Sequence, residues 1–163
     1  MSALVLDYSD EVRISAPLGT VWTHLSDLNY ILRFVPETDE FLVREDGSHA
    51  SCRTVLVIGP LTFPIELEFE LADLTFEEKV TFKSHIPSLQ SELDGSITLR
   101  RASAHETSMK YRAELTTQHK ALRRFKGATA ARLEEHVDGF CSNAAVFIGR
   151  HAEAEDRLLG IDD

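Results

Sequence analysis

The stretch TFPIELEFELADLTF, residues 62–76, alternates apolar and acidic side chains. Four apolar residues fall on one face of an extended chain, namely Ile65, Leu67, Phe69 and Leu71. Three glutamates fall on the other face, namely Glu66, Glu68 and Glu70. Because successive side chains of a strand point to opposite faces, the stretch predicts a strand with one buried face and one wet face. The buried face can pack against a core or border a cavity, and the alternation alone leaves both open.

Similar segments surround this strand and predict an antiparallel meander with one face in water. The further strands are expected at about 5–14, 41–44, 50–58, 80–86, 92–101 and 107–117. Turns are expected at Asp46-Gly47, Gly59-Pro60 and Glu77-Glu78. In the strand at 50–58 two alternations fit equally well. Either Arg53 faces inward with Val55 and Val57, or Cys52 does so with Thr54, Leu56 and Ile58.

Two short helices are predicted after the first strand, and one long helix is predicted after the last. Pro17 suits the start of the first short helix, and Ser26 or Asp27 can cap a second one at 28–34, which Pro36 ends. Apolar residues at spacings of three and four predict the long helix at about 121–150. Its apolar stripe consists of Leu122, Phe125, Thr129, Leu133, Val137, Phe140, Ala144 and Phe147. The last residues, 151–163, are expected to form a polar tail.

Simple dimensions predict how these elements assemble into one domain, residues 1–150. Seven strands about 4.8 Å apart give a sheet roughly 30 Å wide, whereas one helix is about 10 Å wide. The expected fold is therefore α+β, with a curved seven-stranded antiparallel sheet wrapped around the long C-terminal helix. Several inward positions are small: Ser84, Gly95, Ala113, Thr129 and Ala144. Beside the aromatic residues such small positions can interlock tightly or leave a cavity, and we expect an apolar cavity.

The composition argues against several classes of protein. The chain has 163 residues and a formal net charge of −10, with only one small basic cluster at Lys120–Lys126. Nucleic acid is therefore not an expected partner, and membrane contact is expected to be transient at most. Neither a signal peptide nor an apolar run of about 18 residues is visible. The two cysteines, Cys52 and Cys141, are expected to be reduced thiols of a cytoplasmic protein, although the sequence does not exclude a disulfide.

The stretch VRISAPLGTVWTHLSD, residues 12–27, resembles the opening of the START-like helix-grip (SRPBCC) superfamily. Within it, the chain is most similar to the CoxG-like group, which is named after a protein of the carbon monoxide dehydrogenase system. The features that carry this second likeness are Val35-Pro36, Ile58-Gly59-Pro60-Leu61 and the strand Gly95-Ser96-Ile97-Thr98-Leu99. The resemblance implies the helix-grip fold and a cavity for a hydrophobic ligand, in proteins that act as carriers, receptors or polyketide cyclases.

The inward faces supply the candidate ligand-binding residues, and no catalytic or metal site is predicted. The candidates are Leu67, Phe69, Phe82, Tyr111, Leu133, His136, Val137 and Phe140. His136 and Tyr111 are the two that could also move a proton or orient a carbonyl, against the plainer interpretation of a partly exposed histidine and a core tyrosine. The seven histidines match no metal-binding spacing, and no cofactor fingerprint is present.

Three functions remain open from the sequence. The first is non-enzymatic binding and carriage of a quinone, lipid or aromatic compound. The second is a polyketide cyclase or aromatase type of enzyme that uses Tyr111 and His136. The third, which overlaps with the first, is an accessory role beside a redox enzyme, with the acidic surface facing a basic partner. The sequence leaves open the ligand, and a monomer or a homodimer would fit equally well.

Overall fold

The computed structural model describes residues 3–36 and 40–159. The strands are β1 (Leu4–Ile14), β2 (Glu40–Val43), β3 (His49–Ile58), β4 (Leu61–Thr75), β5 (Lys79–Ile86), β6 (Ser91–Ser103) and β7 (Glu106–Thr117). The α-helices are α1 (Leu18–Leu25), α2 (Leu28–Ile31), α3 (Lys120–Arg124) and α4 (Lys126–Leu158), and two 3₁₀ turns are η1 (Leu32–Phe34) and η2 (Pro87–Leu89).

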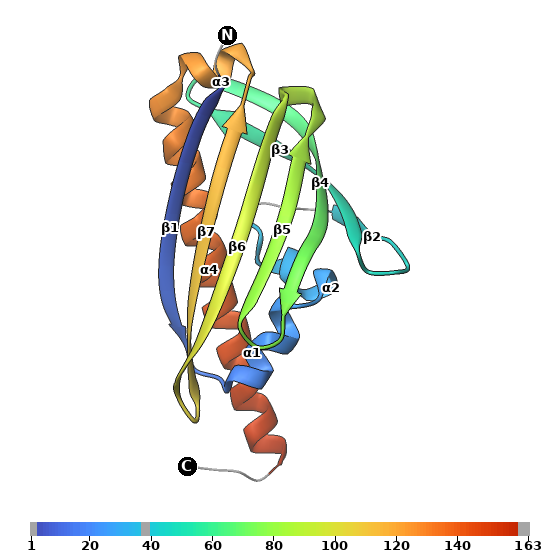
Figure 1. Cartoon of the computed structure of the whole chain (residues 1–163), viewed down its shortest axis with the longest axis vertical. Helices are drawn as coiled ribbons and strands as arrows, with labels where there is room; N and C mark the ends of the chain where they lie inside the picture. The colour runs from blue at the N-terminus through green and yellow to red at the C-terminus, as the bar shows by residue number, and fades with distance from the viewer. Residues whose placement is uncertain (1–2, 37–39, 160–163) are drawn as a thin grey trace.

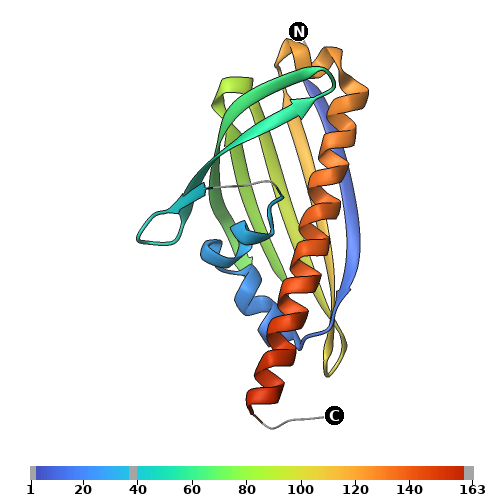
Figure 2. The same cartoon turned by 180° about the vertical axis from the view of Figure 1, so that it is seen from behind.

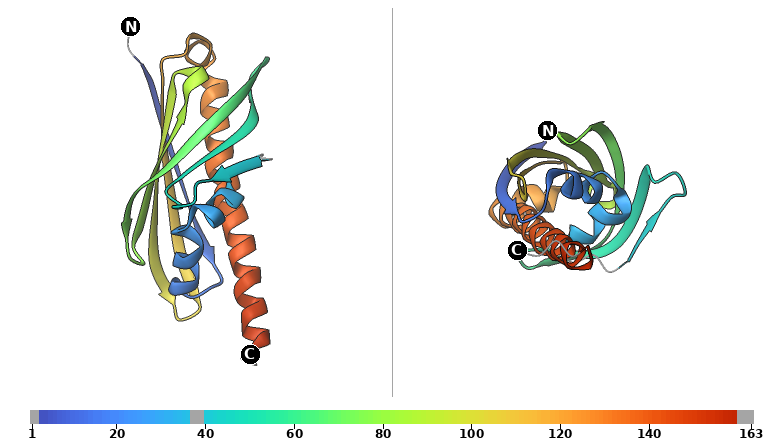
Figure 3. Two further views of the ribbon diagram at one scale, coloured as in Figure 1. Left: turned by 90° about the vertical axis from the view of Figure 1, so that its right-hand side faces the viewer. Right: turned by 90° about the horizontal axis from the view of Figure 1, so that it is seen from below.

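Within the described residues the strands form one seven-stranded antiparallel sheet in the order β1-β7-β6-β5-β4-β3-β2. The sheet curves, and α4 lies in its concave side, with its last turns reaching past the sheet (Figures 1 and 2). Viewed along the long axis, α1 and α2 lie at one end of the curved sheet, beside α4 (Figure 3). The expected helix-grip architecture is thus confirmed: a wide sheet meets a single helix by curling around it.

Strand β4 (Leu61–Thr75) behaves as its alternation predicts. Ile65 and Phe69 are buried and Leu67 and Leu71 are partly buried, while the intervening glutamates are exposed. The two alternations left open for β3 are also resolved: Cys52 and Ile58 are buried, and Arg53 is exposed. Arg53 therefore lies on the outer face of the sheet, where its charge stays in water.

One of the small inward positions, Gly95, does not leave a cavity among the aromatic residues. Phe82 on β5 pairs with Gly95 on β6, and a Cβ atom at Gly95 would overlap the Phe82 ring. Tyr111 packs beside Phe82 with ring centroids 5.7 Å apart, and beside Phe140 with centroids 4.8 Å apart. The expectation of free space at Gly95 was wrong, because a large ring on one strand fills the gap left by the small residue on the next.

The short helices begin and end where the sequence predicts. The Asp27 carboxylate accepts a hydrogen bond from the Asn29 backbone N–H, which caps α2. Val35 has an extended backbone next to Pro36, and Gly139 of α4 lies against that proline. A Cβ atom at Gly139 would lie 2.6 Å from Cγ of Pro36, so the glycine permits this close approach.

The long helix differs from its predicted bounds at both ends. It is interrupted at Phe125, which separates α3 from α4, and it continues to Leu158 instead of ending near Arg150. The expected polar tail from His151 onward is therefore helical up to Leu158. Its residues are good helix formers, Ala152 is buried, and the His151 ring packs against His24 of α1 with centroids 4.8 Å apart.

Candidate functional site

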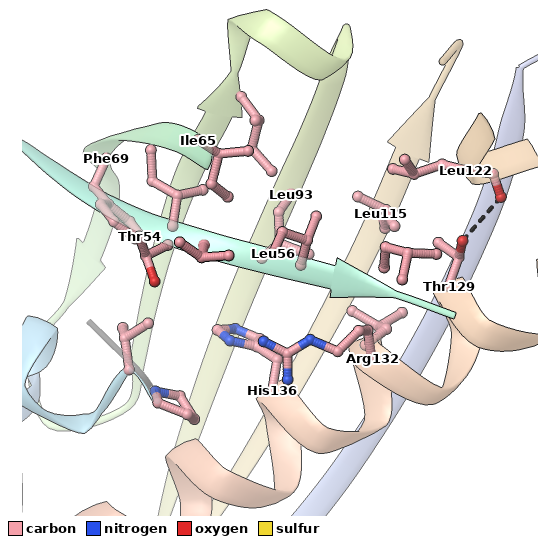
Figure 4. A pocket seen from close by; sticks show the side chains of 17 residues that line it. Thr54, Leu56, Ile65, Phe69, Leu93, Leu115, Leu122, Thr129, Arg132 and His136 are labelled. Carbon is pink, nitrogen blue, oxygen red and sulfur yellow. Dashed lines mark hydrogen bonds between the residues drawn. The ribbon is translucent and has the colours of Figure 1, made fainter. Parts of the chain in front are cut away.

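An apolar pocket lies between β3, β4 and the first half of α4 (Figure 4). Its volume is about 110 Å³. The lining residues are Val35, Pro36, Thr54, Val55, Leu56, Ile58, Ile65, Leu67, Phe69, Ile86, Leu93, Leu115, Leu122, Thr129, Arg132, Leu133 and His136. Ligand pockets of drug-sized molecules usually measure about 300–1,000 Å³, so this one fits a single ring or a short alkyl chain.

The regular spacing of side chains along β3, β4 and α4 brings the lining residues to the pocket. Leu67 and Phe69 follow the two-residue repeat of the inward face of β4, and Thr54 and Leu56 do the same on β3. On α4 the lining residues Thr129, Arg132, Leu133 and His136 follow spacings of three and four, which place them on one face of the helix. The pocket is thus the space between one sheet wall and one helix face.

The structure divides the predicted ligand-binding residues into two groups. Leu67, Phe69, Leu133 and His136 line the pocket together. The other four are buried in the adjoining core and do not line the pocket, namely Phe82, Tyr111, Val137 and Phe140. For all eight, a role in binding stays a prediction, and the first group is the one placed to touch a ligand directly.

His136 and Tyr111, predicted separately as proton-moving candidates, form a hydrogen bond. The Tyr111 hydroxyl lies 2.8 Å from Nε2 of His136, and the Tyr111 side chain is fully buried. Burial, followed by the nearby charge of Arg132, lowers the pKa of His136 to about 4. Burial also raises the pKa of the Tyr111 hydroxyl far above its usual value. At neutral pH the pair therefore consists of a neutral imidazole and a neutral phenol.

Arg132 is the functional candidate that the sequence reasoning missed. Its guanidinium forms an ion pair with Glu135 at 2.9 Å and lines the pocket four residues before His136. Residues 129, 132, 133 and 136 lie on one face of a helix, so their spacing could have identified Arg132. It did not, because a charged residue of an amphipathic helix is ordinarily expected on the solvent-exposed face.

Two aromatic residues and the two cysteines have structural roles outside the hydrogen-bonded pair. The Tyr8 hydroxyl donates to Asp138 at 3.0 Å and ties β1 to α4, and Trp22 packs edge-on against Phe76 with centroids 5.8 Å apart. Cys52 and Cys141 are both buried free thiols, and burial raises the pKa of Cys52 to about 11 and that of Cys141 to about 12. Neither thiol is poised to act as a nucleophile.

In the part of the chain that the structure describes, neither a metal-binding cluster nor a membrane-spanning helix is found. Residues 3–36 and 40–159 contain no cluster of three or more His, Cys, Asp or Glu side chains placed to bind a metal ion. Within the same residues, no helix is both long and apolar enough to span a lipid bilayer.

Comparison with known proteins gives matches at the level of structure. No protein-family model matches the sequence. No match is found among curated proteins. A conserved protein from Geobacillus kaustophilus is similar with a TM-score of 0.71 and 13% identity, over 89% of this chain and 96% of that one. The Zhui aromatase/cyclase from Streptomyces sp. R1128 is similar with a TM-score of 0.65 and 16% identity, over 95% and 96%.

A norcoclaurine synthase from Thalictrum flavum is also similar, and its structure is that of a point mutant with a transition-state analogue. The TM-score is 0.64 and the identity 12%, over 93% of this chain and 98% of that one. At such low identities these likenesses show the fold alone. The class that the sheet, the long helix and these structures define is the helix-grip fold. Chemistry within this fold is decided by the residues of each pocket.

Proposed function

We propose that this protein binds a small apolar molecule in the pocket between β3, β4 and α4, and carries it without changing it. The observation that supports this most is the wall itself. Most lining side chains are aliphatic, and they come from strands and helices far apart in the sequence. A concave apolar wall with few polar groups is typical of small-molecule sites. A quinone, lipid tail or aromatic compound would each offer the apolar part that such a wall accommodates.

The direct test is a titration of methyl-labelled protein with 4-ethyltoluene, a single-ring hydrocarbon, followed by NMR. We expect saturable shifts of the pocket methyl groups of Leu67, Leu115 and Leu133. The methyl groups of Leu99 and Ile148, buried outside the pocket, serve as the control and should move little. Shifts that are absent, or that never saturate, would contradict binding in this pocket. Native mass spectrometry of freshly purified protein would then identify a natural ligand.

The Tyr111–His136 pair favours a second candidate function, an enzyme of the cyclase or aromatase type. His136 is unprotonated at neutral pH and is held in place by its hydrogen bond to Tyr111, but its pKa of about 4 makes it a weak base there. An aromatase/cyclase and a norcoclaurine synthase have similar folds. Against this candidate, Tyr111 does not line the pocket, so only His136 would meet the substrate.

Hydrogen exchange tests the enzyme candidate without knowledge of the natural substrate. The protein is incubated in heavy water with phenylacetone, and deuterium uptake at the carbon next to the carbonyl is followed by NMR. An enzyme of this kind should accelerate uptake, and His136→Gln should remove the acceleration. Equal rates with and without the protein would argue for the carrier.

A partnership with a redox enzyme stays a proposal that rests on the resemblance to the CoxG-like group. The formal charge of −10 suits a basic partner surface. Recovery of a redox enzyme from the native host at low salt, and its loss at high salt, would support this proposal. Consistent absence of such an enzyme at low salt would argue against it.

A further inference from the structure

Polar groups are few in the pocket, and two of them stand together on α4. Of the polar lining side chains, Thr129 donates its hydroxyl to the carbonyl oxygens of Leu122 and Phe125, both at 2.9 Å. Arg132 and His136 lie one helical turn apart, and Figure 4 shows both side chains projecting from α4 toward the space under β3. The pocket therefore has an apolar wall on the sheet and a polar end on the helix.

The hydrogen bond to Tyr111 determines which nitrogen of His136 carries the proton. A buried tyrosine hydroxyl needs an acceptor, and Nε2 of His136 is the one that the described residues provide, at 2.8 Å. We infer that Tyr111 donates to Nε2, which leaves the proton of the neutral imidazole on Nδ1. The Nδ1–H group points away from Tyr111, which lies in the core, so His136 joins the core to the pocket as a hydrogen-bond donor.

Arg132 adds a permanent positive charge beside this donor. This charge acts on His136, where it adds to burial in lowering the pKa of the imidazole. The ion pair with Glu135 lies toward the solvent, where the glutamate side chain is 65% exposed, whereas the arginine side chain is 22% exposed. A guanidinium has five N–H donors and can hold more than one acceptor at once.

We propose that the ligand of this pocket is an apolar molecule that carries one carboxylate, and that Arg132 and His136 bind the carboxylate while β3 and β4 enclose the apolar part. This inference rests on the proposed binding function. A cation and an N–H donor are complementary to a carboxylate, whereas a ligand amine would meet a like charge at Arg132. Tyr111 is a positioning residue, because it acts on the ligand only through the tautomer of His136.

Matched ligands separate this proposal from the simpler binding function. Dissociation constants for 4-ethylbenzoate and 4-ethyltoluene are measured by NMR titration on the wild type, Arg132→Met and Arg150→Met. The last variant is the control, since Arg150 lies further along α4 and outside the pocket. We expect the carboxylate to bind at least about tenfold more tightly than the hydrocarbon, and only Arg132→Met to remove this advantage.

Each other outcome has a distinct meaning. Equal affinities of the two ligands for the wild type would overturn the carboxylate proposal and leave the binding function standing. Failure of both ligands to bind would overturn the binding function and this proposal with it. A carboxylate advantage that survives in Arg132→Met would overturn the role of Arg132.

A spectrum of the histidine nitrogens tests the role of Tyr111. Long-range proton–nitrogen correlations distinguish the two neutral tautomers, and we expect His136 in the wild type to carry its proton on Nδ1. Tyr111→Phe should mix the tautomers and weaken 4-ethylbenzoate binding, with little effect on 4-ethyltoluene. A wild-type proton on Nε2, or an unchanged tautomer in Tyr111→Phe, would overturn this part.

Discussion

Phe82 on β5 and Gly95 on β6 face each other in the sheet, and the Phe82 ring covers the glycine where a side chain would otherwise stand. Tyr111 packs beside the Phe82 ring on one side and beside Phe140 of α4 on the other, so side chains fill this part of the core. The apolar pocket described above lies further along the sheet, toward β3 and β4.

Gly95→Ala should destabilise the protein by about 1–3 kcal/mol, because the new methyl group would overlap the Phe82 ring. Urea unfolding measures the change. Gly127→Ala is the matched control, since nothing lies within 4 Å of a Cβ there and alanine favours a helix, so stability should be unchanged or rise by about 0.5 kcal/mol. A harmless Gly95→Ala would show that the ring does not close this space.

Two neighbouring substitutions on β4 test its two faces. Phe69 is 4% exposed and lines the pocket, so Phe69→Asp places a charge in an apolar wall and should cost more than about 3 kcal/mol or abolish folding. Glu68 is exposed on the outer face, so Glu68→Gln should change stability by less than about 0.5 kcal/mol. Thermal unfolding compares both variants, and similar melting temperatures would contradict the assignment of faces.

His136 makes stability depend on pH. Its folded pKa of about 4 lies below its ordinary value of 6.5, so between these values the unfolded chain binds a proton that the folded protein does not. The contribution of His136 to the free energy of unfolding is complete above about pH 6.5 and is lost as the pH falls toward about 4. For this group the free energy of unfolding should decrease by about 2 kcal/mol from about pH 7.5 to about pH 5.

Urea unfolding of wild type and His136→Gln at the two pH values checks this dependence. The loss on acidification should be smaller by about 2 kcal/mol in His136→Gln. His105→Gln, on an exposed turn, should behave as the wild type does. The same pH dependence in all three proteins would refute a His136 that stays neutral in the folded protein.

The architecture could be predicted from the sequence because strands, helices and turns each leave a local pattern of residues. Alternation identified the faces of β4 and β5, Gly59-Pro60 identified the turn between β3 and β4, and the width of the sheet required curvature. The site was less accessible. Leu67, Phe69, Leu133 and His136 were identified as inward, but whether an inward residue meets a ligand or another side chain depends on interlocking across strands.

That dependence explains both misses at the site. Gly95 suggested empty space, whereas its partner on the next strand fills it, and strand pairing is a long-range property that a local pattern does not contain. Arg132 was not among the candidates, because the search for pocket residues followed apolar side chains, yet its long side chain reaches along the helix surface into the pocket. The end of α4 was missed because polar helix formers give no apolar period after Arg150.

Filling the pocket tests the central claim most directly. Leu133 is 5% exposed and faces the cavity, so Leu133→Trp should occupy the space with its indole ring. Val57→Trp, on the exposed outer face of β3, is the control. In an NMR titration with 4-ethyltoluene, the wild type and Val57→Trp should show the same saturable binding, and folded Leu133→Trp should show none. Undiminished binding by a folded Leu133→Trp would contradict the account.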